Sequence, residues 1–211
     1  MSEYDALLQT IALTMGVAWA SGINLYAAVA MLGLGGTLGY IDLPPTLETV
    51  QDPLVILAAC FMYCVEFMAD KTPGVDSGWD ALHTFIRIPA GAALAAGAVG
   101  DVTPALAIAA GLVGGSVTAA THAGKAGTRV LINTSPEPFS NWAASITEDL
   151  AVFAGLWAAL QHPVLYLLAF AAFLLLLCWL MPKIWRAVAL LFRKIGAWLG
   201  LTQNRPAPSG S

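Results

Sequence analysis

Residues 164–180 read VLYLLAFAAFLLLLCWL, an apolar run of 17 residues without a charged side chain. A helical run of about this length is enough to cross the hydrocarbon core of a bilayer. The rest of the chain has the same character, because 58% of its 211 residues are apolar and only 10% are charged. Soluble domains carry about 25% charged residues. The composition therefore excludes an ordinary soluble surface and a disordered chain, and it predicts an all-α integral membrane protein.

Five further stretches have the length and composition of membrane spans. Together they predict six transmembrane helices, over residues 7–38, 53–69, 81–100, 105–121, 142–160 and 164–180. After these spans, the basic and apolar side chains of residues 183–201 fall on opposite sides of a helix, which is typical of a helix lying at the membrane surface. We therefore expect a transmembrane domain over residues 1–182, an interfacial amphipathic helix over 183–201 and a disordered tail over 202–211.

The nine lysine and arginine residues agree with one orientation. Five of them follow the last predicted span. The other four, Lys71, Arg87, Lys125 and Arg129, lie at the two connections that a six-span topology places on the same side. Since basic residues are retained on the cytoplasmic side, we expect a protein of the cell inner membrane with both termini in the cytoplasm.

Two of the predicted spans contain helix-breaking sequence. Ser21, Gly22 and Asn24 interrupt the first run, which is longer than one span requires, and residues 121–129 interrupt the fourth. Discontinuous helices at matching places in two halves are typical of transporters. Halves of about 1–100 and 101–182 would hold three spans each, and this odd number predicts an inverted repeat.

Ionisable side chains gather at the predicted cytoplasmic ends of the spans, where an intramembrane charge is costly and indicates a functional site. Glu66 and Asp70 lie one helical turn apart. Asp76, Asp80, His83 and Arg87 share one helix face, which suits either a divalent metal or a ladder of salt bridges. The metal, if there is one, stays unknown at this point.

The fourth and fifth spans contribute charges of opposite sign. His122, Lys125 and Arg129 share a face with Thr118, and this face suits either an anionic group or the neutralisation of nearby carboxylates. Glu148 and Asp149 are adjacent and repel each other, so we expect Lys125 or Arg129 to pair with them. The candidate ion- or substrate-binding residues are Glu66, Asp70, Asp76, Asp80, His83, Arg87, His122, Lys125, Arg129, Glu148 and Asp149. No nucleophile–base motif or cofactor motif is present, so we expect no catalytic residue and no cofactor.

Two stretches are similar to a known family. Residues 66–83 read EFMADKTPGVDSGWDALH and residues 135–141 read SPEPFSN. The chain resembles the bacterial membrane family catalogued as domain of unknown function 4126, over nearly its whole length up to about Leu180. The resemblance implies a multi-span membrane protein and brings no established activity.

These observations lead to one main functional hypothesis and two alternatives. The main hypothesis is a small secondary transporter or channel-like carrier for a small ion or charged solute, with proton coupling as one form of it. The first alternative is a membrane-embedded protein or enzyme that binds a lipid phosphate through His122, Lys125 and Arg129. The second is a structural role in which the charges only hold the helices together. We expect membrane lipids as partners, with a homo-oligomer left open, and we exclude nucleic acid because no basic stretch lies outside the C-terminal segment.

Overall fold

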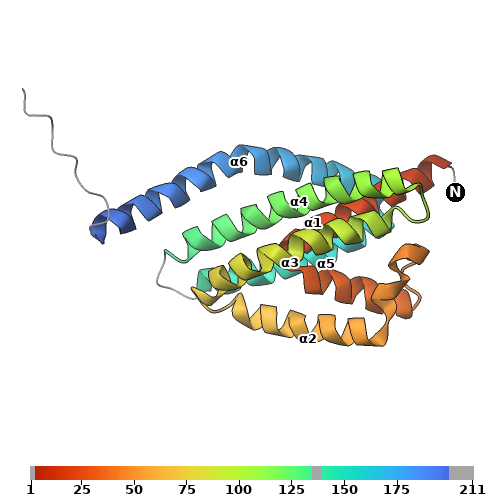
Figure 1. Ribbon diagram of the computed structural model, residues 1–211, viewed down its shortest axis with the longest axis horizontal. Helices are drawn as coiled ribbons and strands as arrows, with labels where there is room; N and C mark the ends of the chain where they lie inside the picture. The colour runs from red at the N-terminus through yellow and green to blue at the C-terminus, as the bar shows by residue number, and fades with distance from the viewer. Residues whose placement is uncertain (1–2, 135–138, 200–211) are drawn as a thin grey trace, which may run out of the picture.

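The computed structural model describes residues 3–134 and 139–199, and every regular element in these ranges is a helix (Figure 1). The elements are α1 (Glu3–Thr37), the short 3-10 helix η1 (Pro45–Gln51), α2 (Pro53–Ala69), α3 (Val75–Ala98), α4 (Pro104–Ile132), α5 (Phe139–Gln161) and α6 (Pro163–Trp198). The all-helical prediction is confirmed for this part of the chain. The predicted tail over residues 202–211 lies outside the described residues, as do residues 135–138.

Several of the helices are long enough and apolar enough to span a membrane. By length and composition α1, α4, α5 and α6 can each cross a membrane, and η1 with α2, which meet at an angle of 64°, can form a fifth span. The surface agrees with this, because Phe85 and Leu175 are exposed while Arg87 is fully buried. Exposed apolar and buried charged side chains are what a lipid environment favours. The chain is a multi-pass membrane protein.

The starts of several helices follow directly from the sequence. Pro53, Pro104 and Pro163 occupy first-turn positions, where proline's missing N–H would have no partner in any case. Asp52 caps α2, since its carboxylate accepts a hydrogen bond of 2.8 Å from the Leu54 amide. These local signals explain why the predicted and observed helix starts lie close together.

The helix break predicted near residues 21–24 lies at Asn24, whose φ of −146° and ψ of 96° are not helical. Residues 3–23, which we call the first limb of α1, run antiparallel to α5. Gly16 of this limb packs against Ala159 near the end of α5, whereas Asn24 bonds to Asp149, ten residues earlier in α5. The first limb therefore runs toward the start of α5.

Residues 25–37, which we call the second limb of α1, return in the opposite direction. Tyr26, at the start of this limb, bonds to His83 near the start of α3. Gly33, near its end, packs against Val50, just before α2 begins. The start of α3 lies at the same end of the bundle as the end of α2. The second limb therefore begins near the end of α2 and runs back toward its start.

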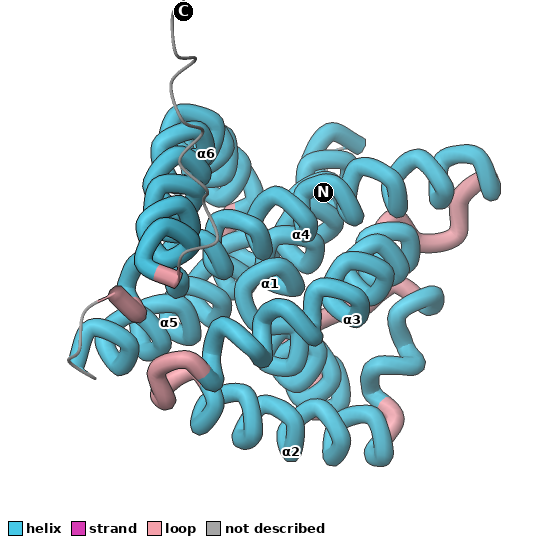
Figure 2. The backbone as a smooth tube through the Cα atoms, turned by 60° about the vertical axis from the view of Figure 1, so that its left-hand side comes forward, coloured by secondary structure: helices cyan, strands magenta, loops and turns pink. Residues whose placement is uncertain are grey.

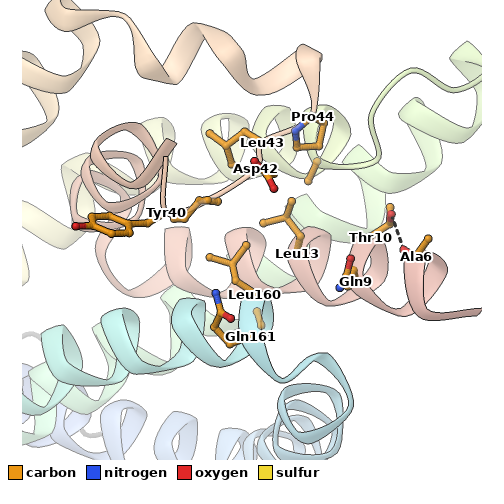
Figure 3. A pocket seen from close by; sticks show the side chains of 13 residues that line it. Ala6, Gln9, Thr10, Leu13, Tyr40, Asp42, Leu43, Pro44, Leu160 and Gln161 are labelled. Carbon is orange, nitrogen blue, oxygen red and sulfur yellow. Dashed lines mark hydrogen bonds between the residues drawn. The ribbon is translucent and has the colours of Figure 1, made fainter. Parts of the chain in front are cut away.

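Both ends of α1 therefore lie at the same end of the bundle. Ala6 and Thr10 of the first limb line a cavity of about 500 Å³ together with Tyr40 and Asp42, which follow the second limb, and Gln161 at the end of α5 (Figure 3). Thus α1 is a helical hairpin whose tip, Asn24, lies inside the protein. It occupies the middle of the bundle, where it contacts each of the other helices (Figure 2).

The hairpin corrects two predictions about topology. Residues 7–38 do not form one span, since apolar length alone cannot distinguish a span from a hairpin of two shorter helices. As a consequence, the N-terminal end of α1 and the C-terminal end of α6 lie at opposite ends of the bundle (Figure 1). The structure therefore does not support the prediction that both termini share one side.

The predicted second break is also absent, because α4 continues as one helix through residues 121–129. Its polar side chains recur every three or four residues, so they share one face and find partners there without disturbing the helix. With a hairpin in the first half and a continuous α4 in the second, the halves do not share an element order, and the predicted inverted repeat is not found. The predicted surface helix over 183–201 is not separate either, since α6 continues through Pro182 to Trp198.

Candidate functional site

Seven ionisable side chains form one connected network of ion pairs, which we call the ionic cluster. They come from α2 and the turn after it, α3, α4 and α5. The members are Glu66, Asp70, Asp80, Arg87, Lys125, Arg129 and Glu148. Six of them are buried, and only the Glu148 side chain keeps substantial exposure, at 20%. The sequence prediction named all seven, and the structure brings them together from separate parts of the chain.

Lys125 is the centre of the ionic cluster. Its ammonium nitrogen Nζ lies within 4 Å of all four cluster carboxylates. The distances are 2.8 Å to Asp70 Oδ2, 3.4 Å to Glu66 Oε1, 3.5 Å to Glu148 Oε2 and 3.8 Å to Asp80 Oδ1. A single ammonium group thus contacts carboxylates from three helices and a turn. Because the lysine side chain is flexible, small movements can bring the ammonium closer to one carboxylate or another.

The tip of the α1 hairpin contributes a backbone group to this centre. Asn24 Oδ1 accepts a hydrogen bond of 2.9 Å from the Ala27 amide, as an N-cap residue does at the start of a helix. Because the first limb ends at the break, the Ile23 carbonyl has no helical partner. It accepts instead from Lys125 Nζ at 3.0 Å. Sequence reasoning missed Ile23, since a backbone contact leaves no signature in residue types.

Each arginine joins two parts of the cluster. Arg87 donates from Nη2 to Glu66 at 2.6 Å and from Nη1 to Asp80 at 2.9 Å. Arg129 donates from Nη2 to Glu148 at 2.6 Å, which is one of the two pairings predicted for this carboxylate. These charge-assisted bonds tie α3 to α2 and α4 to α5.

His122 adds no charge to the cluster. Arg87 Nη1 donates to His122 Nδ1 at 3.0 Å, so this ring nitrogen must carry a lone pair. The other nitrogen, Nε2, lies 3.1 Å from the Asp80 carbonyl oxygen and therefore carries the hydrogen. His122 is thus neutral, and Thr84, whose hydroxyl lies 2.8 Å from Nε2, completes its contacts.

The carboxylates of the ionic cluster outnumber its cations by one. Four acidic groups face three cations, so the buried network carries an excess negative charge when all its groups are ionised. Three carboxylate oxygens of the ionic cluster are also buried without a hydrogen-bond partner among the described residues: Glu66 Oε2, Asp70 Oδ1 and Asp80 Oδ2. Buried charge and unpaired acceptors are both costly. The arrangement can relieve this cost by taking up one proton or one monovalent cation.

Besides His122, three predicted site residues lie outside the ion pairs. Asp76 accepts hydrogen bonds from Asn133 Nδ2 at 2.7 Å and from the Gly74 amide. His83 contacts the Tyr26 hydroxyl at 3.1 Å, and Asp149 accepts from Asn24 Nδ2 at 3.0 Å. In each of these contacts the partner of the predicted site residue is an uncharged group.

The metal interpretation of the α3 face finds no support. In the part of the chain that the structure describes, no three His, Cys, Asp or Glu side chains are placed to hold a metal ion. The face instead contains the ion pair between Arg87 and Asp80, which agrees with the salt-bridge alternative.

Lys71 is a further cation near the cluster, in the turn between α2 and α3. Its ammonium donates to Ser145 Oγ at 3.2 Å and lies over the Phe67 ring. Partial burial lowers the pKa of Lys71 from its ordinary value of 10.5, while nearby Asp149 and Asp70 act in the opposite direction. Lys71 therefore borders the ionic cluster without joining its ion pairs.

The link between Asn24 and Asp149 gives a first prediction. Replacing Asn24 by aspartate keeps an oxygen for the Ala27 amide but brings a second carboxylate against Asp149. We expect a loss of about 2 kcal/mol in the free energy of unfolding, from the lost hydrogen bond and the new repulsion. The reciprocal double variant, Asn24→Asp with Asp149→Asn, should recover most of it, since amide and carboxylate only change places. Chemical denaturation in detergent measures both, and a double variant no more stable than the single one would contradict the pairing.

Comparisons with known proteins identify a family and nothing closer. Neither curated proteins nor solved structures give a match to this chain. The model of the family described as Domain of unknown function (DUF4126) matches residues 11–183, which include the tip and the second limb of the α1 hairpin and the whole ionic cluster. By this match over most of its length, the chain belongs to the DUF4126 family.

Proposed function

We propose that this protein is a small secondary transporter that exchanges a monovalent cation for protons across the membrane. The observation that carries the proposal is the excess carboxylate of the buried ionic cluster. One site that is completed equally well by a proton or by a cation lets the two replace each other. Competition for one site is what exchange requires.

The surroundings of the cluster suit this chemistry. Glu148 is its only member with substantial exposure, so protons and cations would reach the network there. When Glu148 binds either one, its hold on Arg129 and Lys125 weakens, and Lys125 can move toward Asp80 or Glu66. Because Lys125 also binds Ile23, such a movement would reach the tip of α1. Non-helical backbone at membrane depth lines transport sites in many carriers.

We further propose that α2 to α6 each cross the membrane, while α1 enters and leaves from the outer side. The charges of α3 lower its overall hydropathy, but Asp80 and Arg87 are buried and Leu82 and Phe85 on its other side are 63% and 81% exposed. Such a helix is apolar where lipid would touch it. The basic residues lie toward the end of the bundle where α6 finishes, which supports a cytoplasmic C-terminal end and an inner-membrane location.

This topology predicts that the two ends of the chain react with reagents on opposite sides. In a background with Cys60, Cys64 and Cys178 changed to serine, we would introduce Glu3→Cys or Arg193→Cys, both at exposed positions. A membrane-impermeant maleimide should label the first in right-side-out vesicles and the second only after permeabilisation. Labelling of both from the same side would contradict the arrangement.

The lipid-phosphate alternative receives less support from the geometry. Lys125 and Arg129 are already surrounded by carboxylates, and His122 is held by Arg87 and the Asp80 backbone. A phosphate at this place would add negative charge to a cluster that already has an excess. The cation hypothesis does not meet this obstacle.

Reconstitution tests the proposed function. Proteoliposomes that contain a pH-sensitive dye would receive Na⁺, K⁺ or tetramethylammonium outside, with the membrane potential clamped. We expect at least one of these cations to make the lumen more alkaline, faster than in protein-free vesicles, because protons leave as the cation enters. Equal rates with and without protein for all three cations would refute the proposal.

A further inference from the structure

We infer that a cavity between α4 and α6 binds an organic monovalent cation, namely a primary ammonium group attached to a short apolar segment. The inference rests on the proposed function and names the substrate class of the same site. In such a site the ionic cluster would bind the charged headgroup of the ligand, and the apolar side chains of α6 would contact its hydrocarbon part.

The cavity lies directly beside the ionic cluster and has a volume of about 240 Å³. Lys125 and Glu148 line its polar side, while Phe173, Leu177 and Leu180 of α6 line its apolar side. The two kinds of wall face each other across a space that holds a headgroup and a few carbon atoms. A ligand that fills it must therefore be polar at one end and apolar at the other.

The polar side of the cavity offers hydrogen-bond acceptors. Glu148 presents a partly exposed carboxylate. The Thr128 hydroxyl already donates to the Gly124 carbonyl at 2.8 Å, which leaves its lone pairs to accept.

Lys125, the cation that lines this wall, is not available to a ligand. Lys125 Nζ is surrounded by four carboxylates and the Ile23 carbonyl, and its side chain is 3% exposed. An anionic headgroup would meet the exposed Glu148 carboxylate first. Charge and hydrogen-bonding capacity therefore both favour an ammonium headgroup, which donates three hydrogen bonds and neutralises the excess charge.

The apolar side explains why the ligand carries more than an ammonium. A bare inorganic ion would make no contact with the leucine and phenylalanine side chains of α6, whereas a short alkyl segment packs against them. Leu176, which also lines the cavity, is 52% exposed. The cavity therefore opens toward the surface that faces lipid, from which an amphipathic cation arrives.

Calorimetric titration of the protein in nanodiscs tests this inference. The probes are hexylammonium, methylammonium, hexanol and hexanoate. We expect hexylammonium to bind at least tenfold more tightly than the other three, because only it matches both walls. Hexanoate or hexanol binding as tightly as hexylammonium would overturn the inference.

Two variants and one control locate the binding. Glu148→Gln removes the exposed charge, and Leu180→Trp fills the cavity from its apolar wall. Each should weaken hexylammonium binding at least tenfold. Leu175→Trp is the matched control, because Leu175 is 75% exposed and does not line the cavity. Unchanged affinity in Leu180→Trp, which leaves the cluster intact, would overturn the assignment even if Glu148→Gln failed to fold.

The two proposals can fail separately. Cation-driven proton flux without hexylammonium binding would refute the substrate class and leave the exchange function in place. Hexylammonium binding without flux for any cation would refute the exchange function and leave the binding site.

Discussion

Replacement of Lys125 by methionine should lower the free energy of unfolding by about 3–5 kcal/mol, the cost of leaving buried charges without their partner. Methionine keeps much of the volume of lysine but removes the ammonium that lies within 4 Å of four carboxylates. It also leaves the Ile23 carbonyl at the α1 tip without its donor. Thermal and chemical unfolding in detergent would measure the loss.

Two further variants make this result specific. Lys183→Met removes an exposed cation that lies over the Trp179 ring, far along α6, and should change stability by less than about 0.5 kcal/mol. Asp70→Asn in the Lys125→Met background should restore part of the loss, because Asp70 is the carboxylate nearest to Nζ, at 2.8 Å. If Lys125→Met were as stable as the unaltered protein, the ammonium would not be the centre of the cluster.

The sequence allowed the helix faces of the site to be predicted. Residues four or seven apart share a face, so the spacing of Asp80 and Arg87, or of Lys125 and Arg129, already placed each pair on one side of its helix. The repulsion between Glu148 and Asp149 required a cation nearby, and Arg129 is that partner. What spacing could not supply was the choice of neighbouring helix, since a face does not specify what it meets.

The fold of α1 shows a different limit. The residues around Asn24 predicted a break, and the break is there. Whether the chain continues across the membrane or turns back after a break depends on the packing of Gly16 against α5 and of Gly33 beside the start of α2. These contacts join residues far apart in the chain. The number of basic residues on each side could not reveal the hairpin either, because both limbs of α1 lack lysine and arginine.

The break in the α1 hairpin places two helix ends beside the charged side chains of the polar centre. The first limb ends at Ile23, and the partial negative charge of a helix C-terminus faces the Lys125 ammonium. The second limb starts just after Asn24, and its partial positive end lies beside Asp149, which accepts a hydrogen bond from the Asn24 side-chain amide. A helix broken inside the bundle thus supplies both a negative and a positive end to the same polar centre.

The second large effect is expected in transport. Glu148→Gln should reduce cation-driven proton flux to the leak of protein-free vesicles. Glutamine resembles glutamate in shape but can neither take up a proton nor neutralise a cation, so the site would lose its exchangeable position. The amide oxygen can still accept from Arg129, which holds the α4–α5 contact together, and size-exclusion chromatography would verify the fold.

Glu48→Gln is the matched control for the flux measurement. Glu48 is an exposed glutamate on η1, which packs against the C-terminal end of α3, where the Thr46 hydroxyl donates to the Gly97 carbonyl. Its loss removes the same charge from the chain without touching the ionic cluster, so its flux should equal that of the unaltered protein. A Glu148→Gln protein that still moved protons at the full rate would show that the partly exposed carboxylate is not the exchangeable position. The excess charge of the cluster would then need a different role, as a purely structural tie between the helices.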